Sequence, residues 1–291
     1  MRSRRALLYV PGSDLHKIEK AAALDVDGVI LDLEDGVFAN RKDDARLIIA
    51  QALNALNFGR SERLVRINPF YSGRAQADLE AILPGKPDAI VVPKVDSPDI
   101  LAEVDEIITR VEESMTLAQG SIEVIATIES ARAFINLPGI CAASVRLTGL
   151  VFGAEDFTAD AGMTRTSVGT ELLYARSALA LHAVAFNLQA IDMVQTNYSD
   201  IERLTTEARQ AANLGYAGKQ VIHPAQIEAV QRIFTPDQAV IEHAQRIIAG
   251  AAEAAESGHG AFSLDGEMVD LPVIKRAQII LVRARAAGLI P

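Results

Sequence analysis

The hydrophobic residues of this chain gather in short runs that alternate with longer amphipathic segments. The runs are nearly continuous in apolar residues and are bounded by Gly, Pro or Asp, as expected for parallel strands that are covered on both faces. The segments between them are rich in Ala, Leu, Glu and Arg and repeat with the period of a helix. The alternation predicts repeated strand–helix units. The predicted strands are residues 6–10, 28–33, 63–67, 89–92, 123–128, 146–151, 189–193 and 219–222.

The spacing of these strands indicates a closed barrel. Eight strand–helix units within about 230 residues favour an α/β fold of the (β/α)8 or TIM-barrel type over an open doubly wound sheet. No G-x-G-x-x-G sequence follows a predicted strand, which weakens a dinucleotide-binding alternative. The predicted helices are residues 15–23, 43–56, 98–116, 168–187, 199–214 and 224–233.

The pattern changes after Phe234, where Thr235 and Pro236 interrupt it. Residues 237–256 then predict a long Ala-rich helix, residues 257–270 a hairpin or irregular arm, and residues 272–287 a final helix. We therefore expect a catalytic barrel over residues 1–235 and a C-terminal helix and arm over residues 236–291. This second segment is expected to be an appendage and not a second core.

Composition narrows the possible partners and the compartment. The chain has 291 residues, 49% hydrophobic and 23% charged, which is typical of a globular protein with a large core. Its 28 Lys and Arg against 38 Asp and Glu give a net charge of -10, which argues against nucleic acid or an anionic membrane as ligand. No apolar run approaches the roughly 18 residues of a membrane span. The N-terminus passes directly into a predicted strand and Cys141 is the single cysteine, so a cytoplasmic location is expected.

Polar residues at the ends of the predicted strands are the candidates for chemistry, because the carboxyl ends of barrel strands build the active site. Glu129 follows the fifth strand and Asp156 the sixth, so the two carboxylates could share one Mg²⁺ whose other ligands are water and substrate. Arg66 ends the third strand and could face a substrate carboxylate or an enolate oxygen. Lys94 follows the fourth strand, and it receives no role from its position.

Each of these residues has a structural alternative. A single acid at a strand end often caps a helix or forms an ion pair, and Arg66 can pair with a loop carboxylate instead of a substrate. His223, before Pro224, is expected to cap the last barrel helix. A zinc site is not supported, because the five histidines lack ligand spacing and the chain has one cysteine.

Eight segments in a fixed order carry a family resemblance. Together they resemble the citrate lyase beta-subunit-like family, also described as HpcH/HpaI aldolase/citrate lyase, over almost the whole chain. Residues 188–194 and 260–272 are most similar to the citramalyl-CoA lyase branch of that family. The eight segments are LYVPG at 8–12, LDLEDGV at 31–37, VRIN at 65–68, VPKV at 92–95, IESA at 128–131, FGAED at 152–156, GKQVIHP at 218–224 and FTP at 234–236.

The resemblance implies a Mg²⁺-dependent carbon–carbon lyase that cleaves a 3-hydroxyacyl-CoA, with citramalyl-CoA giving acetyl-CoA and pyruvate by retro-Claisen chemistry. It implies a homotrimer or a larger homo-oligomer. By position, Glu129 and Asp156 match the metal ligands, and Asp270 matches a catalytic acid that the tail delivers to a neighbouring subunit. Arg66 matches the substrate arginine. Glu34 and Asp35 are assigned, with Asp32, to orienting the metal's waters, and the residues expected to contact CoA or substrate are Tyr9, His16, Lys20, Ile191 and Asp192.

One departure and several alternatives remain. His16 stands where related sequences often have Lys or Arg, which weakens its expected phosphate contact. Cleavage of malyl-CoA or methylmalyl-CoA, thioester hydrolysis, or a citryl-thioester lyase subunit would use the same residues. A non-catalytic protein that binds CoA thioesters is the alternative outside the enzymes.

Overall fold

The computed structural model describes residues 2–291, which divide into two compact units. The barrel unit comprises Arg4–Gln231. The C-terminal unit comprises Arg232–Pro291 together with the N-terminal residues up to Ser3. The predicted division after residue 235 falls a few residues beyond this boundary.

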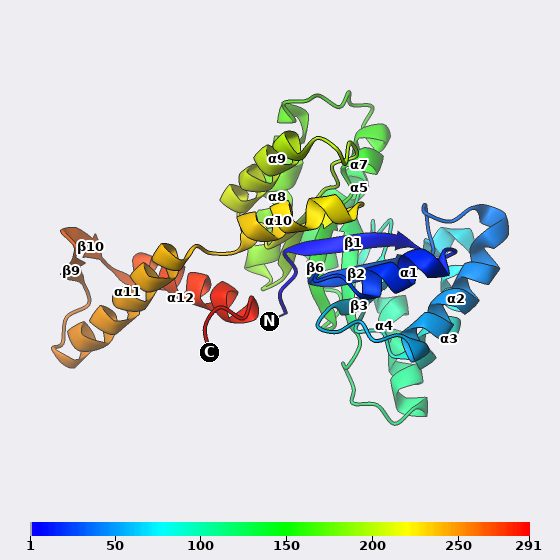
Figure 1. The fold of residues 1–291 in the computed structure, drawn as a ribbon, viewed down its shortest axis with the longest axis horizontal. Coiled ribbons are helices and arrows are strands. Elements are labelled where there is room, and N and C mark those ends of the chain that lie inside the picture. Colours follow the sequence, from blue (N-terminus) through cyan, green and yellow to red (C-terminus); the bar gives the residue numbers. More distant parts are fainter. Residues whose placement is uncertain (1) are drawn as a thin grey trace. The chain divides into compact units, whose positions relative to one another are not determined.

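The barrel unit is a closed ring of eight parallel strands in sequence order, with β8 pairing back onto β1 (Figure 1). This confirms the predicted (β/α)8 fold, and each predicted strand is present to within one residue at either end. The continuous apolar runs are explained by burial, because every residue of β2, β4, β7 and β8 is buried. The strands are β1 Ala6–Pro11, β2 Gly28–Asp32, β3 Glu62–Arg66, β4 Ala89–Val92, β5 Glu123–Ile128, β6 Leu147–Phe152, β7 Gln189–Asp192 and β8 Gly218–Val221.

Helices connect successive strands on the outside of the barrel (Figure 1). The predicted helix over residues 168–187 begins later, at Leu173, after the short 3₁₀ turn Thr170–Leu172. The predicted helix over residues 224–233 opens as the 3₁₀ turn Pro224–Gln226. Four helices were not predicted, because each has at most eight residues and shows little periodicity: α3 Ala75–Ile82, α5 Ala131–Ile135, α6 Leu137–Cys141 and α7 Ala154–Asp160. The others are α1 Leu15–Ala22, α2 Lys42–Ala55, α4 Pro98–Ser114, α8 Leu173–Ala185, α9 Ile201–Leu214 and α10 Ile227–Phe234.

Side chains that point inward from the strands fill the barrel. One apolar cluster takes buried residues from seven strands, from Leu7 of β1 to Ile191 of β7. Below it, at the amino ends of the strands, the Arg4 guanidinium closes the barrel. Its Nη2 lies 2.6 Å from Glu62 Oε1, its Nη1 donates to Thr148 Oγ1 at 2.9 Å, and a second ion pair joins it to Glu123. The interior is therefore packed, and the open end lies at the carboxyl ends of the strands.

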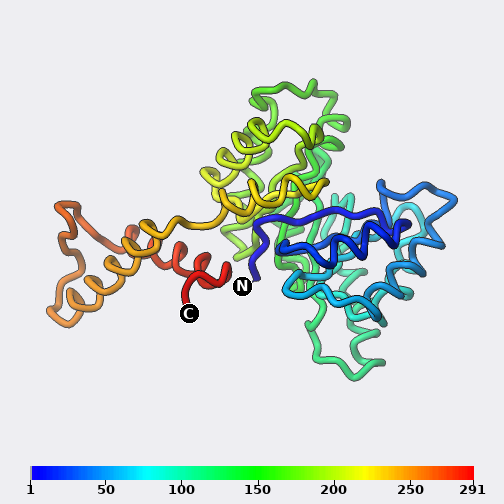
Figure 2. The backbone as a smooth tube through the Cα atoms, in the orientation of Figure 1, coloured from blue at the N-terminus to red at the C-terminus, as the bar shows by residue number. Residues whose placement is uncertain are grey.

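The C-terminal unit is a helical hairpin with a small antiparallel ribbon at its turn (Figures 1 and 2). Helix α11, Gln238–Glu256, leads into β9, Phe262–Leu264, and β10, Glu267–Val269. Helix α12, Leu271–Ala286, then returns along α11. Ile241, Ala244 and Leu281 belong to the apolar cluster between the helices. Among residues 2–291, none of the helices combines the length and apolar content needed to span a bilayer.

Replacing Arg4 by Met should destabilise the barrel strongly. The change breaks the ion pair with Glu62, whose side chain is 2% exposed, and breaking a buried ion pair from one side costs about 3–5 kcal/mol. The free energy of unfolding in urea measures the loss. Arg74→Met is the matched control, because Arg74 is 40% exposed and lies 3.9 Å from Asp43, so its loss should cost less than about 0.5 kcal/mol. Equal stability of the two variants would contradict the structural role of Arg4.

Candidate active site

The carboxyl ends of the strands surround a cavity of about 410 Å³. Acids and one arginine line it, together with apolar side chains from the segments that follow β7 and β8. All eight strands except β4 contribute a residue to the wall, either from the strand or from the segment directly after it. The lining residues are Tyr9, Pro11, Asp32, Asp35, Gly36, Arg66, Thr127, Glu129, Phe152, Gly153, Ala154, Glu155, Asp156, Val194, Gln220 and Ile222.

Arg66 is held by the acids that follow β2. Its Nε and Nη2 donate to the two oxygens of Asp32, each at 2.7 Å, in a bidentate pair between neighbouring strands. Its Nη1 lies 2.8 Å from Glu34 Oε2 and 3.6 Å from Asp35 Oδ2. Its guanidinium also lies over the ring of Tyr9, 4.8 Å from the centroid. Arg66 is therefore a fixed cation at the cavity wall, as its proposed role requires.

Asp32 also shapes the loop that follows it. Its two oxygens accept hydrogen bonds from the backbone N–H groups of Glu34 and Gly36, both at 2.8 Å. A Cβ atom on Gly36 would lie 2.6 Å from Asp32 Oδ2, so this tight turn requires glycine. Lys42 ties the same loop to α2 by donating to the carbonyls of Leu33 and Glu34. Asp32 and Glu34 therefore position Arg66. That they also orient metal-bound water stays a prediction.

Burial changes the protonation of two groups beside Arg66. It raises the pKa of Glu34 to about 8; Arg66 opposes this rise, and the nearby Asp35, Glu129 and Asp32 add to it. Burial also raises the pKa of the Tyr9 phenol, against the influence of Arg66. Glu34 is therefore mostly protonated at neutral pH and Tyr9 keeps its proton. A neutral carboxyl group beside a fixed arginine can donate a proton during a reaction, and it can accept one only after it has ionised.

A second group of charges lies between β4, β5 and β6. The Lys94 ammonium donates a hydrogen bond to Asp156 Oδ1 and lies 3.8 Å from Glu129 Oε1. The Lys94 backbone N–H donates to the same Glu129 oxygen at 2.7 Å. Glu129 is 4% exposed, whereas Asp156 is 43% exposed and belongs to the first turn of α7. The two predicted metal ligands are thus brought together around one cation.

Close packing fixes Glu129. A Cβ atom on Gly153, the N-cap residue of α7, would lie 2.6 Å from Glu129 Cβ, so only glycine lets the carboxylate lie against the start of that helix. Burial raises the pKa of Glu129 to about 7, although Lys94 lowers it. Burial would lower the pKa of Lys94, but hydrogen bonding to Asp156 and the charge of Glu129 raise it. The carboxylate pair therefore favours a bound cation.

The donor set fits Mg²⁺. Within residues 2–291, no group of three or more His, Cys, Asp or Glu side chains forms a complete metal cage. Two oxygen donors at an open cavity are nevertheless what a magnesium ion uses when water and substrate supply its other ligands. Thr127 Oγ1, on β5 two residues before Glu129, is buried and has no hydrogen-bond partner among the described residues. Such a group is commonly satisfied by a water or a ligand in the cavity.

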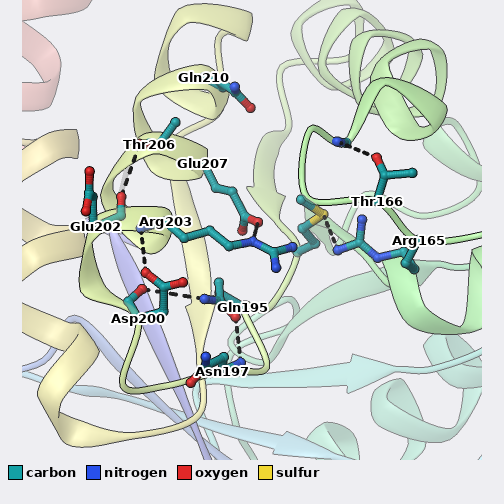
Figure 3. A network of polar contacts seen from close by, with 12 residues as sticks. Arg165, Thr166, Gln195, Asn197, Asp200, Glu202, Arg203, Thr206, Glu207 and Gln210 are labelled. Carbon is teal, nitrogen blue, oxygen red and sulfur yellow. Dashed lines mark hydrogen bonds and ion pairs between the residues drawn. The ribbon is translucent and has the colours of Figure 1, made fainter.

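Polar contacts fix the loops beside β7 (Figure 3). Arg203 Nε donates to Glu207 at 3.0 Å, and its backbone N–H donates to Asp200. Arg165 joins the cavity residue Glu155 to Glu171, at 3.1 and 3.2 Å. Burial would raise the pKa of Glu171, but hydrogen bonds from Thr166 and Arg165 hold it down at about 2. These contacts give the rim of the cavity near Val194 a defined shape.

The other predicted binding residues lie away from the cavity wall. Ile191 belongs to the apolar cluster inside the barrel. Asp192 is fully buried, where it pairs with Arg176 at 3.0 Å and with Lys219 at 2.8 Å. Neither side chain lines the cavity, because neighbouring residues of a strand point to opposite faces and both of these side chains are packed elsewhere. That the two residues contact CoA or substrate stays a prediction.

His16 and Lys20 lie on exposed positions of α1, the helix that follows β1. The nearest acid to His16 is Glu19, at 3.9 Å. Asp270 is the N-cap residue of α12 in the C-terminal unit, where its Oδ1 accepts from the backbone N–H of Val273 at 3.4 Å. This long hydrogen bond caps the start of α12. The roles of all three residues toward CoA or substrate stay predictions.

A (β/α)8 barrel with acids and one fixed arginine around the cavity at its mouth is the architecture of a TIM-barrel enzyme. Sequence comparison identifies the family. A family model described as HpcH/HpaI aldolase/citrate lyase matches residues 5–224, so the chain belongs to this family.

Individual relatives agree with this assignment. The chain is 40% identical to the mitochondrial citramalyl-CoA lyase of Rattus norvegicus, over 97% of this chain and 86% of that protein. It is 37% identical to the citrate lyase subunit beta of Haemophilus influenzae, over 98% of each. Among solved structures, it is similar to the protein CitE of Mycobacterium tuberculosis in complex with magnesium, acetoacetate and coenzyme A. The TM-score is 0.76 and the identity 34%, over 97% of this chain and 98% of that one.

Glu34→Gln should flatten the dependence of stability on pH. A pKa raised to about 8 means that the folded protein keeps a proton that the unfolded chain releases near pH 4.5. Wild-type stability should therefore fall as the pH rises from about 5 to 8, by on the order of 2–4 kcal/mol, and the variant should lose less over that window. Urea unfolding at a series of pH values measures this slope. The exposed Glu103→Gln is the control and should keep the wild-type slope, and a parallel curve for Glu34→Gln would contradict the burial effect.

Proposed function

We propose that the protein is a Mg²⁺-dependent carbon–carbon lyase that cleaves a 3-hydroxyacyl-CoA, with citramalyl-CoA as the first candidate substrate. The observation that carries the proposal is the pairing of Glu129 and Asp156 around one cation, at the same cavity as the fixed cation Arg66. The family and the relatives named above support it. A protein that only binds CoA thioesters has no need of this arrangement.

Different residues of the cavity would have different roles in a retro-Claisen cleavage. Glu129 and Asp156 would hold Mg²⁺, which when bound acidifies a coordinated hydroxyl group and polarises the ketone that forms. Arg66, fixed by Asp32, would stabilise the negative charge that develops on the thioester oxygen. Glu34, protonated at neutral pH, lies beside that charge and would limit the repulsion there.

The apolar part of the cavity favours a substrate with a methyl group. Val194 follows β7 and Ile222 follows β8, and both line the cavity. These strands are neighbours in the barrel, so we take the two side chains together as the apolar edge of the cavity. A methyl group at the carbinol carbon, as in citramalyl-CoA, would be buried there, whereas malyl-CoA would leave the edge uncovered. Burying this methyl group would favour citramalyl-CoA over malyl-CoA by about 1–3 kcal/mol in the free energy of the transition state.

The tail supplies the final group in this proposal. During cleavage, Asp270 of one subunit would donate a proton to the enolate carbon at the cavity of a neighbouring subunit, within a homotrimer or a larger homo-oligomer. The proton lost by the substrate hydroxyl would pass to water in the open cavity.

The acidic, single-cysteine chain is consistent with the proposed cytoplasmic location, since it needs no disulfide.

Glu129→Gln and Asp156→Asn should each abolish Mg²⁺-dependent cleavage while the cooperative unfolding transition remains. The test follows release of the keto acid from citramalyl-CoA, malyl-CoA and citryl-CoA, with and without Mg²⁺. The wild-type enzyme should prefer citramalyl-CoA. Exposed Glu103→Gln is the control. Release of free CoA without keto acid would identify a thioesterase, and wild-type activity in either metal-site variant would refute the shared-metal assignment.

Asp270→Asn should keep the oligomer and Mg²⁺ binding but lose about 10²–10⁴-fold in rate, because proton transfer is removed. If the tail acts between subunits, mixing Asp270→Asn with Glu129→Gln subunits should restore activity, since some cavities then combine an intact metal pair with an intact tail. Mass spectrometry establishes that mixed oligomers form. Mixed oligomers without recovered activity would show that the tail does not act in a neighbouring subunit.

A further inference from the structure

Lys94 holds both predicted metal ligands at once. Its backbone N–H donates to Glu129 Oε1 at 2.7 Å, and its ammonium contacts Asp156 and lies 3.8 Å from the same Glu129 oxygen. Its φ of 53° lies in the left-handed region, which residues with a side chain rarely adopt. In this turn, the backbone N–H and the side-chain ammonium of Lys94 both point toward Glu129 and Asp156.

The Lys94 ammonium and a magnesium ion are both cations that would compete for the same place beside the two carboxylates. Two carboxylates that share a site repel each other unless a cation lies between them. A single ammonium offsets only one of the two negative charges, whereas Mg²⁺ offsets both. Mg²⁺ binds carboxylate oxygens at 2.0–2.1 Å, and a lysine ammonium held at the same oxygens would be repelled by it.

The two contacts of Lys94 differ in mobility. The backbone hydrogen bond to Glu129 is fixed by the turn after β4, and Glu129 is buried. The side chain is 26% exposed and its partner Asp156 is 43% exposed, so the ammonium can leave Asp156 through solvent. Lysine is also a strongly hydrated charge on a flexible stem.

We propose that the Lys94 ammonium is the counter-cation of the metal-free site and that Mg²⁺ displaces it, while the Lys94 backbone continues to hold Glu129. Lys94 is then a positioning residue with opposite effects in the two states. It stabilises the metal-free barrel and weakens Mg²⁺ binding. The inference rests on the proposed use of Mg²⁺ by Glu129 and Asp156.

The test compares metal-free wild-type protein with Lys94→Met by calorimetric titration of MgCl₂. The variant should bind Mg²⁺ about three- to tenfold more tightly, because no ammonium competes for the carboxylates. A merely structural role would weaken binding instead. Lys86→Met is the matched control, because Lys86 is an exposed lysine with a φ of 51° and lies before β4, so it should bind Mg²⁺ as the wild type does.

Thermal unfolding provides a second readout. Without metal, Lys94→Met should melt at a lower temperature than the wild type, and saturating Mg²⁺ should close the gap by the amount that the affinity difference predicts. Lys94→Asn repeats both measurements with a side chain that tolerates left-handed backbone, and it carries the test if Lys94→Met does not fold.

The outcomes separate this inference from the proposed function. Equal or weaker Mg²⁺ binding by folded Lys94 variants, with binding intact in the wild type, would overturn the counter-cation role alone. A wild-type protein that binds no Mg²⁺ would overturn both proposals.

Discussion

The bidentate ion pair between Asp32 and Arg66 is the contact on which the barrel mouth depends. It joins β2 to β3, and the same Asp32 oxygens also hold the backbone of the loop that carries Glu34 and Gly36. An arginine that is free to move would neutralise whichever carboxylate it met. Because Arg66 is confined between Asp32 and the ring of Tyr9, its position is set before any substrate binds, which is the condition for electrostatic stabilisation of a reaction.

Confinement of Arg66 separates the acids of the mouth into two groups. Asp32, Glu34 and Asp35 surround Arg66, and Glu129 and Asp156 surround Lys94. Each group has more carboxylates than cations. Around Arg66 the excess is relieved by protonation, because burial raises the pKa of Glu34 to about 8. Around Lys94, burial raises the pKa of Glu129 to about 7, so that carboxyl group is only partly protonated at neutral pH. The negative charge that remains on Glu129 and Asp156 can be offset by a metal ion.

Sequence reasoning predicted the barrel because burial on both faces leaves a strong signal in each strand. It also placed Arg66, Glu129 and Asp156 at one cavity, because the carboxyl ends of parallel strands share one side of the barrel. The direction of a side chain was harder to predict. Ile191 points into the barrel core and Asp192 pairs with helix α8 through Arg176, so the binding role assigned to both stays a prediction. In strands that are apolar on both faces, no alternation reveals which residue faces inward. Lys94 was noted at a strand end without a role, because its left-handed backbone leaves no pattern in the sequence.

A buried lysine–aspartate pair lies elsewhere in the barrel. Comparing it with Lys94 and Asp156 shows why the exposure of such a pair decides its function. Lys219 and Asp192 have fully buried side chains and are surrounded further by Arg176 and Glu207. Removing one partner there would leave a buried charge unpaired, and no solvent path allows an ion to replace it. The Lys94 and Asp156 pair has the same chemistry, but both side chains are partly exposed to solvent, and Asp156 lines the cavity. The first pair can therefore only stabilise the fold beneath α8 and α9, whereas the second can exchange one cation for another without disturbing the barrel.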